Sequence, residues 1–354
     1  MNSSYIWKFL GVALILYSLI FGLLIPLKPG IVATSPSIAN GGDTLSLFYS
    51  VYNVDYTKID PSGIKAWLLI NDGKDILADK NEVLSATEGR AEFRLPLLTD
   101  RDQAVVSSTL VVSDPKHGYA LLPSALAIRP AKSTQAEKVL SINYQTADVD
   151  MVDGVSFPFR NILQETIRNT YYHVPLWFSM IILFAISAFY SARYLRRRDS
   201  RSDLYAVAFA EFATLLGILG LLTGAIWARF TWGAFWSWDI KQFTSAVALL
   251  IYFAYFILRS SVADQDKRAR LTSSYNIFAF VMLIPLLFIV PRLTDSLHPG
   301  NGGNPAMGGE DLDQTMRWVF YPAVVGWILL GMWVSQLKAR YLIIQRKIEE
   351  KFTI

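Results

Sequence analysis

Apolar residues gather into six long runs along the chain, and each run is bounded by polar or charged residues. A helix needs roughly 20 apolar residues to cross a hydrocarbon core of about 30 Å, so the pattern predicts six transmembrane helices. The fourth and fifth runs are short by this measure, and Pro285 is expected to kink the fifth. A Ser-rich start with a single Lys8 and no small-residue cleavage site favours an uncleaved first helix. The runs cover about residues 6–27, 175–194, 205–227, 243–258, 275–290 and 318–337.

Between the first two runs, the chain changes to the alternation of apolar and polar residues that is typical of β-strands. Turn signals such as Asn40-Gly-Gly-Asp43 and Asn71-Asp-Gly73 separate the alternating segments, so residues 28–130 are expected to form an inserted β-sandwich-like domain. No catalytic motif occurs in it, which favours a docking or spacing role. Residues 131–172 are expected to be a polar linker followed by an amphipathic approach to the second helix. The clearest alternating segments are residues 45–51, 64–70 and 104–112.

Basic residues mark one side of the membrane. They cluster between runs two and three, between runs four and five, and after run six, so these segments should be cytoplasmic. Both termini are then inside, in a bacterial inner membrane, and residues 339–354 form a cytoplasmic tail. The β-domain and the segment between runs three and four lie outside, in the periplasm. The clusters are Arg193, Arg196, Arg197, Arg198 and Arg201; Arg259, Lys267, Arg268 and Arg270; and Lys338, Arg340, Arg346, Lys347 and Lys351.

Composition supports the class and narrows the chemistry. The 354 residues are 53% hydrophobic, and the net charge is only +4, which favours a membrane protein over a nucleic-acid-binding one. The absence of cysteine excludes disulfides, thiolate metal sites and cysteine nucleophiles. Imidazole chemistry is limited to three histidines, His117, His173 and His298.

A block of tryptophans lies between the third and fourth runs: four of the ten fall within residues 227–238. The indole ring is apolar but carries an N–H group that needs a partner, so tryptophan favours the membrane–water boundary. Such a dense block, in a segment expected to span residues 227–242 as a loop, predicts a flat aromatic platform. Its expected ligand is large, planar and hydrophobic.

Two of the histidines flank this platform in the predicted topology. His173 stands at the outer mouth of the second helix, and His298 lies just beyond the outer end of the fifth. Imidazole is a common haem ligand, and two imidazoles on opposite faces would clamp a flat macrocycle. The alternative is that both are interfacial histidines bonded to water or backbone. His117, in Asp114-Pro-Lys-His117, is expected to be a surface turn residue.

The segment Trp232-Gly-Ala-Phe-Trp-Ser-Trp-Asp239 matches the W-G-x-x-W-x-W-D signature of the haem-handling membrane proteins of cytochrome c maturation. Together with Tyr172-His173-Val-Pro175 and the position of His298, it resembles the CcmC branch over about residues 160–340. Lys241, however, gives a W-D-x-K spacing that is more similar to the CcsA branch. CcsA proteins also use histidines inside their helices, which this chain lacks, and the β-domain is outside the compact CcmC pattern. CcmC is therefore ranked above CcsA, with a hybrid lineage left open.

The resemblance implies roles for individual residues. His173 and His298 would be axial ligands of haem b, and Asp239 would orient indole or backbone N–H groups. Arg168 and Arg229 would pair with haem propionates or, alternatively, contact lipid headgroups. Glu211, inside the third helix, is either a functional carboxylate or one that snorkels to the cytoplasmic surface. The platform would consist of Trp232, Gly233, Trp236 and Trp238.

The activity implied is haem presentation by residues 173–338, a five-helix domain. It would offer haem to a periplasmic chaperone of the CcmE type, with a small CcmD-type partner and a CcmA–CcmB-type ABC complex. The chain has no Walker A sequence, so it would not itself hydrolyse ATP. A binding and transfer protein is favoured over a catalyst. Two alternatives stay open: a CcsA-type lyase that attaches haem to apocytochrome c, and a transporter subunit or redox protein that carries haem.

Overall fold

The computed structural model describes residues 3–70, 74–98, 105–130, 142–147, 154–298 and 312–352. The chain divides into two compact units, a helical unit of residues 1–25 with 165–354 and a β-rich unit of residues 26–164. Each unit is described below by itself.

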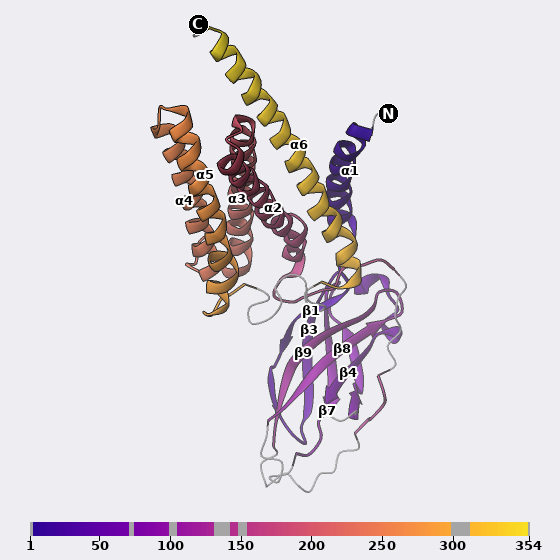
Figure 1. Ribbon diagram of the computed structural model, residues 1–354. Coiled ribbons are helices and arrows are strands. Elements are labelled where there is room, and N and C mark those ends of the chain that lie inside the picture. The colour runs from indigo at the N-terminus through magenta and orange to yellow at the C-terminus, as the bar shows by residue number, and fades with distance from the viewer. Residues whose placement is uncertain are drawn as a thin grey trace. The chain divides into compact units, whose positions relative to one another are not determined.

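Within the described residues, six helices of the helical unit are long and apolar enough to cross a membrane, which fits a polytopic membrane protein and confirms the predicted number (Figure 1). The fourth and fifth helices have 22 and 20 residues, so the prediction that they are short is wrong. Their ends carry polar residues that a search for apolar runs leaves out. The helices are α1 (Ser3–Leu24), α2 (His173–Arg197), α3 (Ser200–Trp232), α4 (Ile240–Ser261), α5 (Gln265–Ile284) and α6 (Gln314–Phe352).

The regular α-helix α5 ends at the proline for which the sequence predicted a kink. The α-helix α5 ends at Ile284, and Pro285–Ile289 continue as a π-helical turn. Proline has no N–H group to donate to the preceding turn, so the regular hydrogen-bond ladder is interrupted there. The sixth helix, in contrast, contains Pro322 and still continues to Phe352, so residues 339–352 of the predicted tail are helical.

Helices α2, α3 and α5 are joined by buried polar contacts. The Asn276 side chain of α5 donates to Ser187 Oγ at 2.7 Å and to Ser191 Oγ at 2.8 Å, both on α2. Ser187 Oγ in turn donates to the carbonyl oxygen of Ala206 on α3 at 2.6 Å. Interhelical hydrogen bonds of this kind fix the pairing of helices in lipid, where apolar contacts alone discriminate poorly.

Helix α1 packs mainly along α6 (Figure 1). The single hydroxyl proton of Ser18 is shared between the carbonyl oxygen of Val319 on α6, 3.2 Å from Oγ, and that of Leu14 in its own helix, at 2.9 Å. The first helix therefore belongs to the helical unit, although the β-rich unit separates it from α2 in the sequence.

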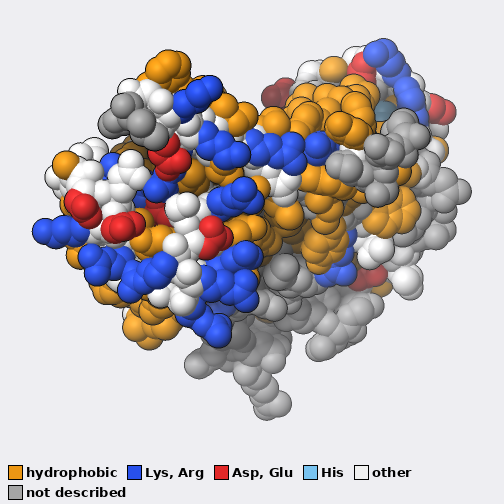
Figure 2. All heavy atoms as spheres, turned by 45° about the horizontal axis from the view of Figure 1, so that its top comes forward, with side chains coloured by type: hydrophobic (Ala, Val, Ile, Leu, Met, Phe, Trp, Pro, Cys, Tyr) orange, Lys and Arg blue, Asp and Glu red, His pale blue; other side chains and the backbone are white. Residues whose placement is uncertain are grey.

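One end of the helical unit, at the connections α2–α3 and α4–α5, is rich in Lys and Arg side chains (Figure 2). A buried ion pair lies at this end. Arg259 of α4 donates to both carboxylate oxygens of Asp203 on α3, at 2.8 and 2.7 Å, and to Thr272 Oγ1 of α5 at 3.1 Å. The guanidinium of Arg259 thus joins α3, α4 and α5, and its planar arrangement of N–H groups suits the two oxygens of the carboxylate.

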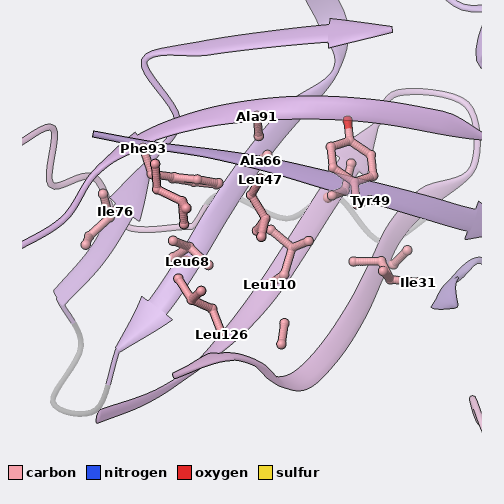
Figure 3. Packing of buried hydrophobic residues seen from close by; sticks show 14 of the residues in the cluster. Ile31, Leu47, Tyr49, Ala66, Leu68, Ile76, Ala91, Phe93, Leu110 and Leu126 are labelled. Atoms are coloured by element: carbon pink, nitrogen blue, oxygen red, sulfur yellow. The ribbon is translucent and has the colours of Figure 1, made fainter. Parts of the chain in front are cut away.

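The β-rich unit is a sandwich of two sheets, in the strand orders β1-β3-β7-β6 and β2-β9-β8-β4-β5. Its core lies between the sheets, where side chains such as Leu47, Leu68 and Phe93 point toward one another (Figure 3). All neighbouring strands are antiparallel except β2 and β9. The strands are β1 (Gly30–Ser35), β2 (Ile38–Asn40), β3 (Thr44–Tyr52), β4 (Lys65–Ile70), β5 (Lys74–Leu77), β6 (Lys80–Val83), β7 (Glu88–Arg94), β8 (Val106–Asp114) and β9 (Gly118–Arg129).

The alternating segments at residues 45–51 and 64–70 fall on β3 and β4, as predicted, and β3 alternates between buried and more exposed residues. Part of the predicted linker belongs to this unit, because Tyr144 forms an antiparallel bridge with Ile76 of β5. The predicted turn at residues 71–73 lies outside the described residues, as do residues 131–141 and 148–153 of the linker. Gln164–Tyr171 form a 3-10 helix directly before α2.

Candidate functional site

The tryptophan-rich motif is built from two helix ends rather than from one loop. Helix α3 continues to Trp232 and ends at Gly233, whose φ of 83° lies in the left-handed region that glycine adopts without steric cost. Asp239 is the N-cap of α4 and accepts a hydrogen bond from the N–H of Lys241 at 2.9 Å. The expectation of a loop over residues 227–242 is therefore wrong at both ends, and the connection itself covers residues 233–239.

Gln242 in the first turn of α4 holds this connection in place. Its Oε1 accepts from the N–H of Ser237 at 3.0 Å, and its Nε2 donates to the carbonyl oxygen of Phe235 at 3.3 Å. The residue is buried. This role was not predicted from the sequence, and it satisfies both the buried amide and backbone groups of the connection.

The tryptophans form two edge-to-face pairs. Trp227 and Trp232, on the last turns of α3, have ring centroids 5.1 Å apart, and Trp236 and Trp238 have centroids 5.8 Å apart. Trp238 is 74% exposed and has a φ of 59°, a conformation that is rare for a bulky side chain. The surroundings hold this residue in a strained conformation while its ring remains accessible, which is typical of functional positions.

His298 packs against the first of these pairs. Its ring centroid lies 4.9 Å from that of Trp232 and 5.6 Å from that of Trp227. The segment before it is fixed by Asp239, whose Oδ2 accepts from Ser296 Oγ at 2.9 Å and from the N–H of Leu297 at 2.8 Å. The structure thus brings His298 next to two of the tryptophans of the predicted aromatic platform segment.

Asp239 also binds the imidazole directly: His298 Nδ1 lies 3.1 Å from Asp239 Oδ1. Burial alone would raise the pKa of Asp239, but hydrogen bonds from His298, Leu297 and Ser296 outweigh it and hold the pKa well below its usual range. The carboxylate therefore accepts the Nδ1 proton. A neutral His298 is then left with the lone pair on Nε2, as in carboxylate–histidine–metal arrangements.

His173 stands at the first residue of α2, where Pro175 is tolerated because the first-turn N–H groups have no helical partner. Its Nδ1 lies 3.0 Å from Thr223 Oγ1 on α3. Thr223 and Trp227 are one helical turn apart, so α3 contacts His173 and His298 through neighbouring side chains on the same face.

The two arginines have protein partners in this structure. Arg168 donates to the carbonyl oxygens of Gly22 and Ile25 at 2.8 and 2.7 Å, at the end of α1, and pairs with Glu165. Arg229 is exposed and donates to the carbonyl oxygen of Gly233. Pairing of either with a propionate stays a prediction, and Arg229 is the more accessible.

Two further residues have structural partners. Glu211 of α3 forms an ion pair with Lys338 of α6 at 3.0 Å, and both side chains are about two-fifths exposed. His117 lies in a turn between β8 and β9, as expected, with its Nδ1 3.1 Å from Asp114 Oδ1.

Comparison with known proteins identifies the helical part. Residues 131–353 match the family described as CcmC, heme exporter protein C. The chain is 27% identical over 183 residues to heme exporter protein C of Paracoccus denitrificans, covering 52% of this chain and 76% of that protein. The protein of the same name from Bradyrhizobium diazoefficiens is 26% identical over 188 residues, covering 52% and 69%. A shorter match of 71 residues, 38% identical, covers 20% of this chain and 22% of cytochrome c biogenesis protein CcsA from Prochlorococcus marinus.

Proposed function

The chain belongs to the heme exporter protein C family and handles haem in cytochrome c biogenesis, and from this premise we propose that it clamps haem between His173 and His298. The proposed ligand is haem b at the outer face of the membrane. The proposed activity is presentation of this haem to a periplasmic chaperone of the CcmE type, rather than catalysis.

One observation carries this proposal. Two imidazoles from distant parts of the sequence contact neighbouring residues of one helix face, and each has its Nδ1 next to a fixed oxygen acceptor, Thr223 Oγ1 or Asp239 Oδ1. A histidine that donates Nδ1–H in this way offers Nε2 to a metal. Two such ligands would fill both axial positions of the iron, so the haem would be held and not used for oxygen chemistry.

The aromatic residues would support the apolar surface of the macrocycle. Trp232 packs on His298, and Trp236 and Trp238 form a second pair beyond Gly233 in the sequence, so indole rings are available next to a proposed ligand and further along the motif. Arg229 lies on the same terminal turns of α3 and would neutralise a propionate. The exposed ring of Trp238 would be the part nearest to a docking chaperone.

The orientation proposed is that of the positive-inside rule. The basic end of the helical unit (Figure 2) would be cytoplasmic, with the start of α1 and the end of α6 on that side (Figure 1). The site at the opposite ends of α3 and α4 would then face the periplasm of the inner membrane, as would the β-sandwich. A small CcmD-type partner and a CcmA–CcmB-type complex are proposed from the family, because the chain has no nucleotide-binding motif of its own.

The CcsA-type lyase is the second candidate, and the local match to CcsA proteins favours it. The W-D-x-K spacing that ends at Lys241 is a further similarity to the CcsA branch. Against it, the chain has only three histidines, and His117 lies in the β-sandwich, so no further pair remains for a second haem site in the helices.

A transfer experiment separates the two candidates. The haem-loaded, detergent-purified chain is mixed with a soluble CcmE-type chaperone or with a reduced apocytochrome c peptide that carries its two haem-binding thiols. Presentation predicts that haem moves to the chaperone and that the thiol peptide remains unmodified. Haem attached to the peptide in the absence of any chaperone would establish the lyase instead.

A further inference from the structure

His173 has a partner at each ring nitrogen, and neither partner was expected from the sequence. Nδ1 lies 3.0 Å from Thr223 Oγ1, and Nε2 lies 3.3 Å from Nε1 of Trp177. Trp177 is on α2, one turn after His173, and its ring is nearly perpendicular to the imidazole, at 77°. The nitrogen assigned above to iron is therefore bonded to an indole in this structure.

These contacts determine where the imidazole proton lies. An indole N–H group only donates, so Nε2 must accept from Trp177 and cannot carry a proton. The proton is then on Nδ1, which donates to Thr223 Oγ1. The Thr223 hydroxyl is free to accept, because its own proton goes to the carbonyl oxygen of Leu219 at 2.9 Å or of Gly220 at 3.0 Å. Each donor in this series of hydrogen bonds, from the Trp177 indole through His173 and Thr223 to the backbone of α3, therefore has an acceptor.

Helix α3 is shaped to receive both rings. A Cβ at Gly224 would lie 2.7 Å from Cε1 of His173, and a Cβ at Gly220 would lie 2.8 Å from Cε2 of Trp177. The two glycines are four residues apart, as are the two rings on α2. Each ring therefore packs directly on the backbone of α3, and Thr223 stands between the glycines with its hydroxyl at Nδ1.

We propose that Thr223 and Trp177 are positioning residues for haem uptake: Thr223 fixes the His173 tautomer that offers Nε2, and Trp177 occupies Nε2 until iron replaces its N–H group. This inference rests on the proposed function for the identity of the ligand. The indole N–H group competes with iron for one lone pair, so it lowers affinity for haem, whereas Thr223 raises it. Substitution of the two residues should therefore change haem affinity in opposite directions, although both contact the same ring. Loss of packing alone would lower the affinity in both cases.

Haem titration of the full-length chain in detergent tests both signs. Trp177→Phe keeps an aromatic ring but removes the donor, and haem affinity should rise by about 2- to 12-fold, the worth of one neutral hydrogen bond. Thr223→Val keeps the shape but removes the acceptor, and affinity should fall by roughly 10- to 100-fold, as for other outer-shell partners of metal-ligating histidines. Thr223→Ser should restore most of the loss.

Matched controls are available within the helical unit. Trp327 of α6 is a partly buried tryptophan of the helical core, and Thr214 of α3 makes the same back-bond to its own helix, to Ala210, without touching a histidine. Trp327→Phe and Thr214→Val should leave haem affinity unchanged. Weaker binding by Trp177→Phe, or equal losses in Thr223→Val and Thr214→Val, would overturn the proposal.

A measurement without haem separates this inference from the proposed function. Nitrogen-15 NMR of the histidine-labelled, haem-free chain should place the His173 proton on Nδ1, and Thr223→Val combined with Trp177→Phe, which removes both partners of the ring, should move it partly to Nε2. His173 and His298 resonances are assigned by the single alanine variants. A proton on Nε2 in the unaltered chain would refute the inference even if haem binds, whereas failure of the unaltered chain to bind haem would refute the proposed function and leave the proton position measurable.

Discussion

Asp239→Asn is the substitution that tests the organisation of the site most sharply. Asp239 accepts four hydrogen bonds: Oδ1 from Lys241 N–H and His298 Nδ1, and Oδ2 from Ser296 O–H and Leu297 N–H. An asparagine offers one acceptor oxygen, and its amide group donates at the other position. Two of the four bonds are therefore lost or must reverse their direction, whichever way the amide turns.

Both orientations weaken haem binding. If the amide group faces His298, Nδ1 must accept, and the proton moves to Nε2, the proposed iron ligand. If it faces Leu297, the segment that carries the histidine is released. A hydrogen bond to a charged group contributes about 1.5–3 kcal/mol. Haem affinity should accordingly fall by about 10- to 100-fold, since each tenfold change corresponds to about 1.4 kcal/mol.

The assay is a haem titration of the full-length chain, followed by absorption. Asp264→Asn is the matched control, because Asp264 caps α5 through Lys267 N–H at 2.6 Å and is placed at a helix N-terminus like Asp239. Asparagine caps helices as well as aspartate does, so haem affinity should be unchanged in the control. Unchanged haem affinity in Asp239→Asn, or an equal loss in Asp264→Asn, would refute the reasoning.

Three further predictions concern the two units. Arg259→Met should lower the stability of the helical unit by about 3–5 kcal/mol, because it leaves the Asp203 carboxylate buried and unpaired; the double variant with Asp203→Leu should recover most of this loss. An unchanged melting temperature of the single variant in detergent would show that the ion pair does not stabilise the unit. Burial raises the pKa of Tyr49 to about 12, so its neutral form stabilises the β-sandwich fully below about pH 10 and the contribution, about 2–3 kcal/mol, is lost as pH rises to 12. Urea unfolding followed by near-UV circular dichroism should show that the stability of Tyr49→Phe depends less on pH between about 10 and 12 than that of the unaltered chain. The same pH dependence in both proteins would contradict this prediction. Trp238→Asn should leave the melting temperature unchanged or raise it, since a positive φ costs a bulky residue about 1–2 kcal/mol, and it should slow haem transfer to the chaperone. A large loss of stability would show that the exposed ring contributes to packing in the fold.

The elements that the sequence predicted well are those encoded by a local period. Within the described residues, the six apolar runs correspond to six helices, because a long apolar run indicates a segment that is stable in lipid. The alternation over residues 45–51 corresponds to β3, because one face of that strand is buried in the sandwich. Helix ends were predicted less well. The first turn of α4 contains Lys241 and Gln242, which interrupt an apolar run, although Asp239 before them is a good N-cap.

The site was predicted in part. His298 and the tryptophans meet as expected, because the motif and the predicted topology placed them on one side. Thr223 was missed because its partner lies 50 residues away on another helix, and the register between α2 and α3 is not readable from one sequence. Trp177 left a weak signal, since a tryptophan four residues after a candidate ligand shares its helix face.

The ligand set of the haem is the central claim, and absorption and electron paramagnetic resonance spectra of the haem-loaded chain test it most directly. The account predicts a six-coordinate low-spin haem in the unaltered chain, and loss of that spectrum in both His173→Ala and His298→Ala. His117→Ala, in the β-sandwich, should keep the full spectrum and serves as the matched control. A six-coordinate spectrum that survives in both His173→Ala and His298→Ala would contradict the account.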